Sequence, residues 1–155
     1  MTLQKGDPVE DFELLGHDGT SVVLSNFKNS KNVVLCFYPK NHLFACPSKK
    51  VFEMAKSVIS VYPKIVSTDT VLFAISVDSV ESQAKFVKEY EIPYVHLSDP
   101  KKIASKKYAG TNIAGLAKRS TFVIDKNGII QDVMREINVS SHGQEILDSL
   151  NKIKV

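Results

Sequence analysis

Two cysteines, Cys36 and Cys46, are the strongest nucleophiles that the sequence offers. A thiol in the first turn of a helix faces unpaired backbone N–H groups and the positive end of the helix dipole, and both stabilise the thiolate. Apolar residues recur at helical spacing after Cys46, and Pro47 suits a first turn, so we expect Cys46 to lie at a helix start and to be reactive. Position alone leaves a structural role for Cys46 open.

Cys36 has a different setting in the sequence. It lies inside a continuous apolar run over residues 32–38, the pattern of a central strand that is buried on both faces. Burial disfavours the charged thiolate and raises the pKa of a thiol, so we expect Cys36 to be chemically quiet. A disulfide between Cys36 and Cys46 would require the helix to unwind or the strand to shift.

The elements that must position Cys46 alternate between strands and helices. Buried strands are predicted over residues 32–38 and 70–77, with a shorter strand over 94–97. Helices are predicted from Cys46 onward, from Asp78 with Glu81 in a capping box, over 101–108, and after Ser141. Turn signals predict an N-terminal hairpin of 11–14 with 21–24, and a later hairpin of 120–124 with 129–136.

This order predicts an α/β fold in which a central parallel or mixed sheet carries helices on its faces. No linker or repeat divides the chain, so residues 1–155 are expected to form one domain. Sites in such sheets lie beyond the carboxyl ends of strands, where strand-to-helix loops meet helix N-termini. The expected loop from Pro39 to Cys46 has this position.

The length, charge and apolar runs of the sequence exclude several classes of protein. With 155 residues, 43% of them hydrophobic, the chain can bury a core without disulfides or a structural metal. The net charge is only +3, and the sequence has no concentrated run of lysines and arginines of the kind that nucleic-acid-binding proteins carry. No apolar run approaches the ~20 residues of a membrane span, and the N-terminus, MTLQKGDPVEDF, has no targeting pattern. We therefore expect a cytoplasmic protein, in a thiol-reducing compartment, that binds neither nucleic acid nor membrane.

Two other kinds of cysteine chemistry fit the sequence poorly. A zinc site from Cys36, His42 and Cys46 would draw one ligand from a buried strand, and it lacks a paired C-x-x-C motif. The absence of C-x-x-C also excludes thioredoxin-type dithiol exchange. His42 is interpreted as an exposed loop residue, with a local hydrogen-bonding role near Cys46 as the alternative.

Several segments together resemble a known family. FYPKNHLFAC (37–46), DSVESQAKFVKEYEIPYVHLSDP (78–100) and KRSTFVIDKNG (118–128) resemble the peroxiredoxins, and most of all the bacterioferritin comigratory protein or peroxiredoxin Q class. The likeness extends from GDPVEDFEL near the start to SHGQEILDSL near the end. It implies a thioredoxin-like fold with an N-terminal β-hairpin extension, and a thiol peroxidase that needs neither metal nor haem.

The resemblance assigns roles to three matched residues. The family pattern is a proline, three residues, a threonine, two residues and a cysteine, and Pro39 and Cys46 match it. Arg119 matches the arginine that precedes the TFVID strand. The resemblance implies that Cys46 is the peroxidatic cysteine, Arg119 its cationic partner and Pro39 a packing shield over the thiolate. An arginine suits this role because its fixed donors can stabilise charge on the leaving oxygen.

Three positions depart from the family pattern. Leu43 replaces the threonine whose hydroxyl bonds the thiolate and the peroxide. Lys49 replaces a glutamate that helps to hold the arginine, and it would repel Arg119. Val51 occupies the place of the cysteine with which some members of the class resolve their own sulfenic acid.

The sequence therefore predicts a peroxidase of one-cysteine type, which reduces hydrogen peroxide or organic hydroperoxides through a sulfenic acid at Cys46. The expected reductant is an external thiol, either a thioredoxin-like protein or a small thiol. The expected assembly is a monomer or a homodimer. The alternative, favoured by Leu43 and Lys49, is a catalytically weakened redox sensor or interaction module.

Overall fold

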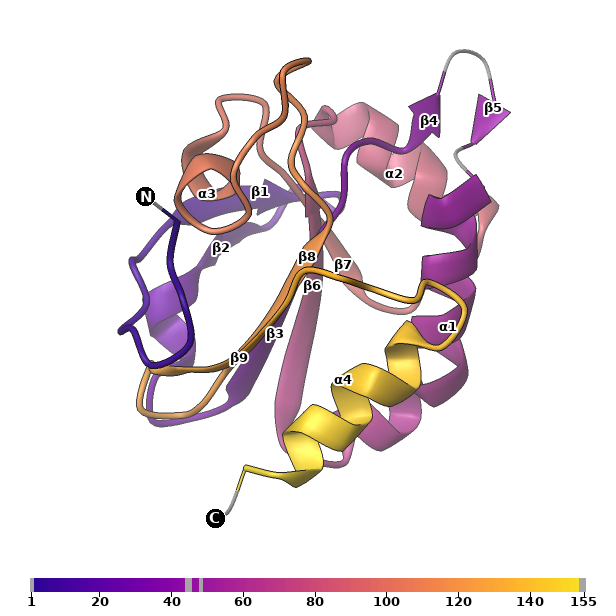
Figure 1. Cartoon of the computed structure of the whole chain (residues 1–155). Coiled ribbons are helices and arrows are strands. Elements are labelled where there is room, and N and C mark those ends of the chain that lie inside the picture. Colours follow the sequence, from indigo (N-terminus) through magenta and orange to yellow (C-terminus); the bar gives the residue numbers. More distant parts are fainter. Residues whose placement is uncertain (1, 44–45, 48, 154–155) are drawn as a thin grey trace.

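The computed structural model describes residues 2–43, 46–47 and 49–153, and the surroundings of the side chains for residues 2–41 and 49–153. Seven strands form one mixed sheet in the order β2-β1-β7-β6-β3-β8-β9 (Figure 1). These strands are β1 (Glu13–Gly16), β2 (Ser21–Val23), β3 (Asn32–Phe37), β6 (Thr70–Ser76), β7 (Val95–Ser98), β8 (Ser120–Ile124) and β9 (Ile130–Met134). The helices are a 3-10 turn, η1 (Leu24–Phe27), with α1 (Lys49–Val66), α2 (Val80–Glu89), α3 (Ile103–Lys107) and α4 (His142–Asn151).

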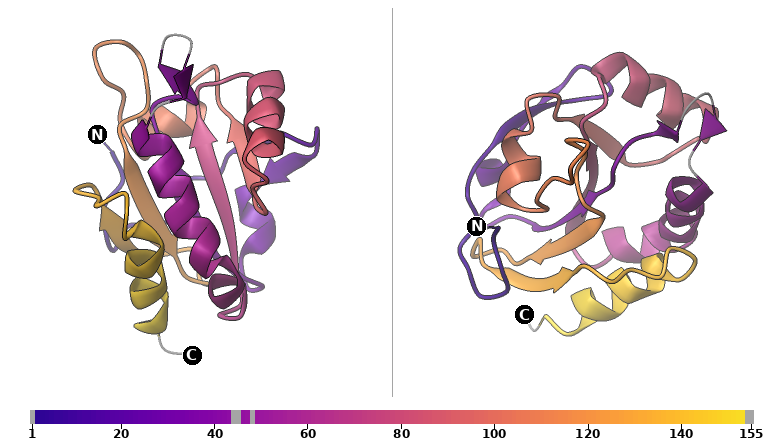
Figure 2. Two further views of the ribbon diagram at one scale, coloured as in Figure 1. Left: turned by 90° about the vertical axis from the view of Figure 1, so that its right-hand side faces the viewer. Right: turned by 45° about the horizontal axis from the view of Figure 1, so that its top comes forward.

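β3 is a central strand of the sheet, and both of its faces are buried. It pairs in parallel with β6 and antiparallel with β8. Cys36 and Tyr38 belong to an apolar cluster that also includes residues of α1, α2 and α4. These three helices cover one face of the sheet (Figure 2). Leu35 and Phe37 point into a second cluster on the other face, which includes residues of α3 and of the N-terminal segment. The continuous apolar run of β3 follows from this position, because neither face meets water.

The other predicted elements are present, with shifts at their ends. Both predicted hairpins are confirmed, since β1 pairs antiparallel with β2 and β8 with β9. The prediction of a capping box at Asp78 is wrong by one residue. Ser79 caps α2, because its side chain accepts the backbone N–H of Ser82 at 3.1 Å. The predicted α/β class, a mixed sheet flanked by helices, is confirmed.

The start of α1 differs from the prediction. α1 begins at Lys49, whereas Cys46–Pro47 form the short strand β5, which pairs antiparallel with β4 (His42–Leu43). The physical reason is Pro47, because a proline ring disfavours helical backbone at the residue before it. Cys46 therefore lies before the helix, and the prediction that it occupies the first turn is wrong.

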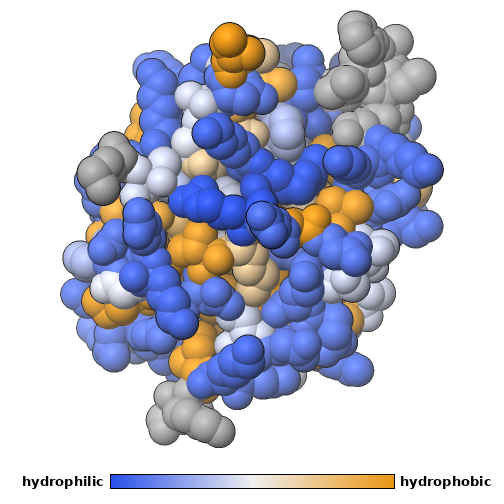
Figure 3. All heavy atoms as spheres, viewed as in Figure 1, coloured by the Kyte–Doolittle hydropathy of each residue, from blue (hydrophilic) through white to orange (hydrophobic). Residues whose placement is uncertain are grey.

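The helices are amphipathic and present their polar sides to water. α1 buries Val51, Met54, Ala55, Val58 and Ile65 against the sheet. In the view of Figure 3, hydrophilic residues cover most of the surface, with apolar groups scattered between them. Within the described part of the chain, no helix combines the length and the apolar composition that crossing a membrane requires.

The packing of α4 against α1 requires a glycine at position 143. The backbone N–H of Gly143 donates to Ser57 Oγ at 2.8 Å, and a Cβ at this position would overlap the backbone carbonyl of Ser57. We predict that Gly143→Ala lowers the free energy of unfolding by about 1–3 kcal/mol, the usual cost of overpacking. Denaturant unfolding measures this effect. The neighbouring exposed substitution Gln144→Ala is the control, with an expected change within about 0.5 kcal/mol. Equal stability of Gly143→Ala and the wild type would contradict the packing.

Candidate active site

The end of β3 and the start of β8 bring two of the predicted site residues to one edge of the sheet. The strands are antiparallel, with Phe37 opposite Ser120. Pro39 lies just beyond the end of β3, and Arg119 directly precedes β8, so both residues lie at this edge. The parallel strands β3 and β6 have their carboxyl ends here, which is the usual position of sites in α/β folds.

Arg119 is half-buried against α1. Its Nη1 donates to Sδ of Met54, a buried residue of α1, at 3.5 Å. Burial lowers the pKa of the guanidinium from its usual value, but an arginine remains protonated at neutral pH. No ion pair found among the described residues includes Arg119. A thioether is a weak acceptor, so the guanidinium keeps strong donors for an anionic group at this edge.

The predicted nucleophile is carried by the hairpin of β4 and β5, which leads from this edge to α1 (Figure 1). In the register of the hairpin, Leu43 lies opposite Cys46. The side chains of His42, Leu43 and Cys46 lie outside the described part of the structure. Their backbone connects the edge of the sheet to Lys49, the first residue of the helix that contacts Arg119.

Comparison with known proteins identifies the family to which the chain belongs. Residues 5–133 match the AhpC/TSA family. The chain belongs to this family. It is 33% identical to Peroxiredoxin Bcp of Bacillus subtilis, over 97% of this chain and 96% of that protein. It is also 33% identical to the chloroplastic Peroxiredoxin Q of Sedum lineare, over 97% of this chain and 79% of that protein. Among solved structures, the crystal structure of Peroxidoxin BcpB from Mycobacterium tuberculosis is 30% identical and has a TM-score of 0.86 over 99% of each chain.

These relatives confirm the resemblance to the bacterioferritin comigratory protein and peroxiredoxin Q class. They also confirm the thioredoxin-like fold, in which β1 and β2 form the predicted N-terminal extension. The chain is a peroxiredoxin, an enzyme that reduces peroxides with electrons from a thiol.

Cys36 of this peroxiredoxin is buried, which confirms that prediction. The residue is 1% exposed and lies in β3 between Ala74 of β6 and Thr121 of β8. Burial raises the pKa of its thiol to about 12, and a hydrogen bond with Thr121 offsets only part of this effect. A bond to Cys46 would require Cys36 to leave the strand, because a disulfide tolerates little deviation in geometry.

Two departures from the family pattern lie in the first turn of α1. The side chain of Lys49 is 90% exposed and its Nζ lies 4.0 Å from Glu53 Oε1. Water therefore screens its charge, and the predicted repulsion of the half-buried Arg119 is weakened. Val51 is only 4% exposed and packs in the core beneath α1. Apolar packing thus occupies the resolving position of the family pattern.

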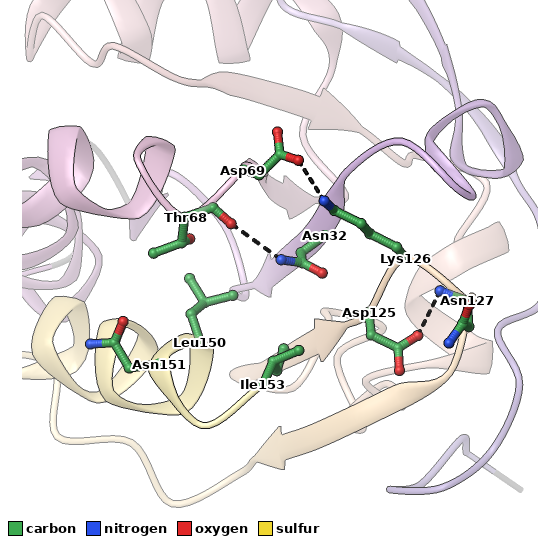
Figure 4. A pocket seen from close by; sticks show the side chains of 9 residues that line it. All are labelled: Asn32, Thr68, Asp69, Asp125, Lys126, Asn127, Leu150, Asn151 and Ile153. Atoms are coloured by element: carbon green, nitrogen blue, oxygen red, sulfur yellow. Dashed lines mark hydrogen bonds and ion pairs between the residues drawn. The ribbon is translucent and has the colours of Figure 1, made fainter. Parts of the chain in front are cut away.

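A pocket of about 450 Å³ lies at the opposite edge of the sheet (Figure 4). Asn32, the first residue of β3, and Asp125, which follows β8, are among the residues that line it. Asp69 accepts hydrogen bonds there from Lys126 and Lys31, each at 2.6 Å, and these partners lower the pKa of its carboxyl to about 2. The pocket is therefore separate from the candidate active site, and its Asp69 carboxylate is already paired.

Sequence reasoning missed a buried polar cluster behind Pro39. Tyr38, Asn41 and His96 are each at most 2% exposed, and hydrogen bonds join them. By sequence, Tyr38 is one more residue of an apolar strand and Asn41 is part of a loop. The available signal was the position of these polar groups beside a buried strand, where each group must find a partner.

The burial of Cys36 predicts a large difference in reactivity between the two cysteines. In the folded protein at neutral pH, we predict that iodoacetamide modifies Cys36 at least about 100-fold more slowly than Cys46, because a buried protonated thiol is not nucleophilic. Peptide mass spectrometry over a time course measures both rates. In denaturant, the control condition, the rates should converge. Equal rates in the folded protein, or a faster reaction at Cys36, would show that the assignment of the reactive thiol is wrong.

Proposed function

We propose that Cys46 is the residue of this peroxiredoxin that attacks the peroxide, with Arg119 as its cationic partner and Pro39 as a shield over the thiolate. One observation carries the proposal. Arg119 lies at the same edge of the sheet as Pro39, and it contacts Met54 of α1, the helix that begins shortly after Cys46. The burial of Cys36 supports the same assignment, because it leaves Cys46 as the better nucleophile.

The first step is the attack of the Cys46 thiolate on one oxygen of the peroxide. An S–O bond forms and the O–O bond breaks, and the electron pair of the O–O bond leaves with the second oxygen. Arg119 donates hydrogen bonds to the peroxide and stabilises the negative charge that develops on this leaving oxygen. The oxygen then takes up a proton to give water or an alcohol, and Cys46 is left as a sulfenic acid.

The second step needs a thiol from outside the chain. The thiol attacks the sulfur of the sulfenic acid, which forms a disulfide with Cys46 and releases water, and a second thiol then displaces Cys46. Val51 in the resolving position and the burial of Cys36 both support a one-cysteine enzyme. A thioredoxin-like protein or a small thiol suits this step, in a monomer or a homodimer. Because the cycle consumes thiols, we place it in the cytoplasm.

Stoichiometric oxidation tests the proposal. One equivalent of hydrogen peroxide without thiol is expected to leave the wild-type chain with one oxygen gained at Cys46, with no internal disulfide and with no disulfide to a second copy. Mass spectrometry with a sulfenic-acid probe measures this product. Cys36→Ser is the matched control and should react at the wild-type rate, whereas Cys46→Ser should not react.

Two results would count against this function. Oxidation of Cys46→Ser at the wild-type rate would show that another residue reacts, and a bridge between Cys36 and Cys46 in most molecules would exclude the one-cysteine cycle. Oxidation of Cys46 that is too slow to sustain turnover with excess thiol would favour the redox sensor. Leu43, which lies opposite Cys46 in the hairpin, is the feature that favours this alternative.

A further inference from the structure

A largely buried polar cluster lies directly behind the candidate active site, between the end of β3 and α2. Its members come from the ends of β3 and β6, from α2 and from β7, and hydrogen bonds connect all of them. We call it the Asn41 cluster, and it consists of Tyr38, Asn41, Ser76, Asp78, Ser82, Gln83 and His96. Asn41 is 0% exposed, although it lies outside the strands and helices.

Every polar group of the Asn41 side chain has a partner in this cluster. Its Oδ1 accepts the hydroxyl of Tyr38 at 2.5 Å. Its Nδ2 donates to Ser82 Oγ at 3.1 Å and to Gln83 Oε1 at 3.0 Å. Its backbone N–H donates to Asp78 Oδ2 at 2.9 Å. The side chain therefore has one favourable orientation, and the chain is fixed at the residue that precedes β4.

The protons of the cluster can be assigned from its acceptors. The hydroxyl of Tyr38 has two oxygen acceptors in reach, Asn41 Oδ1 at 2.5 Å and Gln83 Oε1 at 2.9 Å, and Gln83 Oε1 already accepts from Asn41 Nδ2. The single proton of Tyr38 is therefore assigned to Asn41 Oδ1, and Nδ1 of His96, 2.9 Å from the Tyr38 oxygen, donates to that oxygen. Burial lowers the pKa of His96 to about 3, so the ring is neutral and carries this one proton on Nδ1. Nε2 is then a buried acceptor with no partner among the described residues. Gln83 completes the cluster, since its Nε2 donates to Ser76 Oγ at 2.9 Å and to the carbonyl of Leu97 at 3.0 Å.

The Nε2 of His96, without a partner in the described part of the chain, lowers the stability of the folded protein, so apolar residues in place of the cluster would stabilise the core more. The position of the cluster suggests a functional reason for it. Pro39 lies between Tyr38 and Asn41, and both of these residues are fixed by the cluster. On its other side, the end of β3 is held by its pairing with β8, which begins directly after Arg119.

We propose that Tyr38 and Asn41 are positioning residues for the peroxidase reaction. They fix the point at which the Cys46 hairpin leaves the sheet, and so set the place of Pro39 and Cys46 relative to Arg119. The inference rests on the proposed role of Cys46. It requires no contact between the Asn41 cluster and the peroxide, because the cluster acts through the backbone of residues 38–41.

The test compares two buried tyrosines. Tyr38→Phe removes the hydroxyl that holds Asn41. The control is Tyr108→Phe, because Tyr108 is 0% exposed, lies in the cluster on the other face of the sheet, and bonds the backbone of Glu10. We expect Tyr38→Phe to lower the second-order rate with hydrogen peroxide by at least about tenfold, since small displacements of reacting groups cost one to two orders of magnitude. It should also move the pH midpoint of Cys46 alkylation. Tyr108→Phe should leave both values at the wild-type level.

A folded Tyr38→Phe with the wild-type rate and alkylation profile would overturn the inference. If Tyr38→Phe does not fold, Ser82→Ala decides, because it removes only one partner of Asn41 from a partly exposed position on α2. A fall of at least about threefold in the peroxide rate, the lower range for one neutral hydrogen bond, supports the inference, and an unchanged rate overturns it. A wild type that does not react with peroxide would count against the proposed function alone, because the alkylation profile still reports the surroundings of Cys46.

Discussion

The burial of β3 on both faces is the constraint on which the active-site edge depends. With apolar clusters on either side, a slip of one residue would move Cys36 and Tyr38 from one cluster to the other, so the register is strongly specified. That register puts Phe37 opposite Ser120. Arg119 and Pro39 therefore lie at the same edge of the sheet because the core fixes the register of two antiparallel strands.

The electrostatics of this edge follow from what surrounds the guanidinium. Arg119 is partly desolvated, and its hydrogen-bond partner in the described structure is the sulfur of Met54. A desolvated charge is costly without an opposite charge nearby. An anion that arrives at this edge, such as a thiolate or the leaving oxygen of a peroxide, reduces that cost. The same edge thus favours the charged states through which a peroxidase works.

The sequence predicts the framework of the fold well and its local details less well. β3 and β6 were predictable because long apolar runs have one stable place, inside the sheet. The helix after Cys46 was predictable from the spacing of residues such as Val51 and Met54, but its first residue was not. Helical spacing reports the buried face of a helix, whereas the start depends on the backbone around Pro47.

The candidate site also has parts that the sequence predicts and parts that it does not. Cys46, Pro39 and Arg119 could be selected from the sequence because they match a family pattern. The Asn41 cluster could not, because its hydrogen bonds join residues as distant as Tyr38 and His96, and such pairs have no periodic signal in the chain. The edge of the sheet itself required the pairing of β3 with β8, which is a property of the fold.

The most direct test is the rate of reaction of Cys46 with hydrogen peroxide in Arg119→Met, with Lys118→Met as the matched control. Both substitutions remove one positive charge from adjacent residues, but Lys118 is exposed and Arg119 is half-buried at the edge. If Arg119 stabilises the transition state, Arg119→Met should react at least about 100-fold more slowly than the wild type. Lys118→Met should stay within about twofold of the wild type, because an exposed charge is screened by water. A folded Arg119→Met that reacts at the wild-type rate would contradict the assignment of Arg119 as the partner of Cys46.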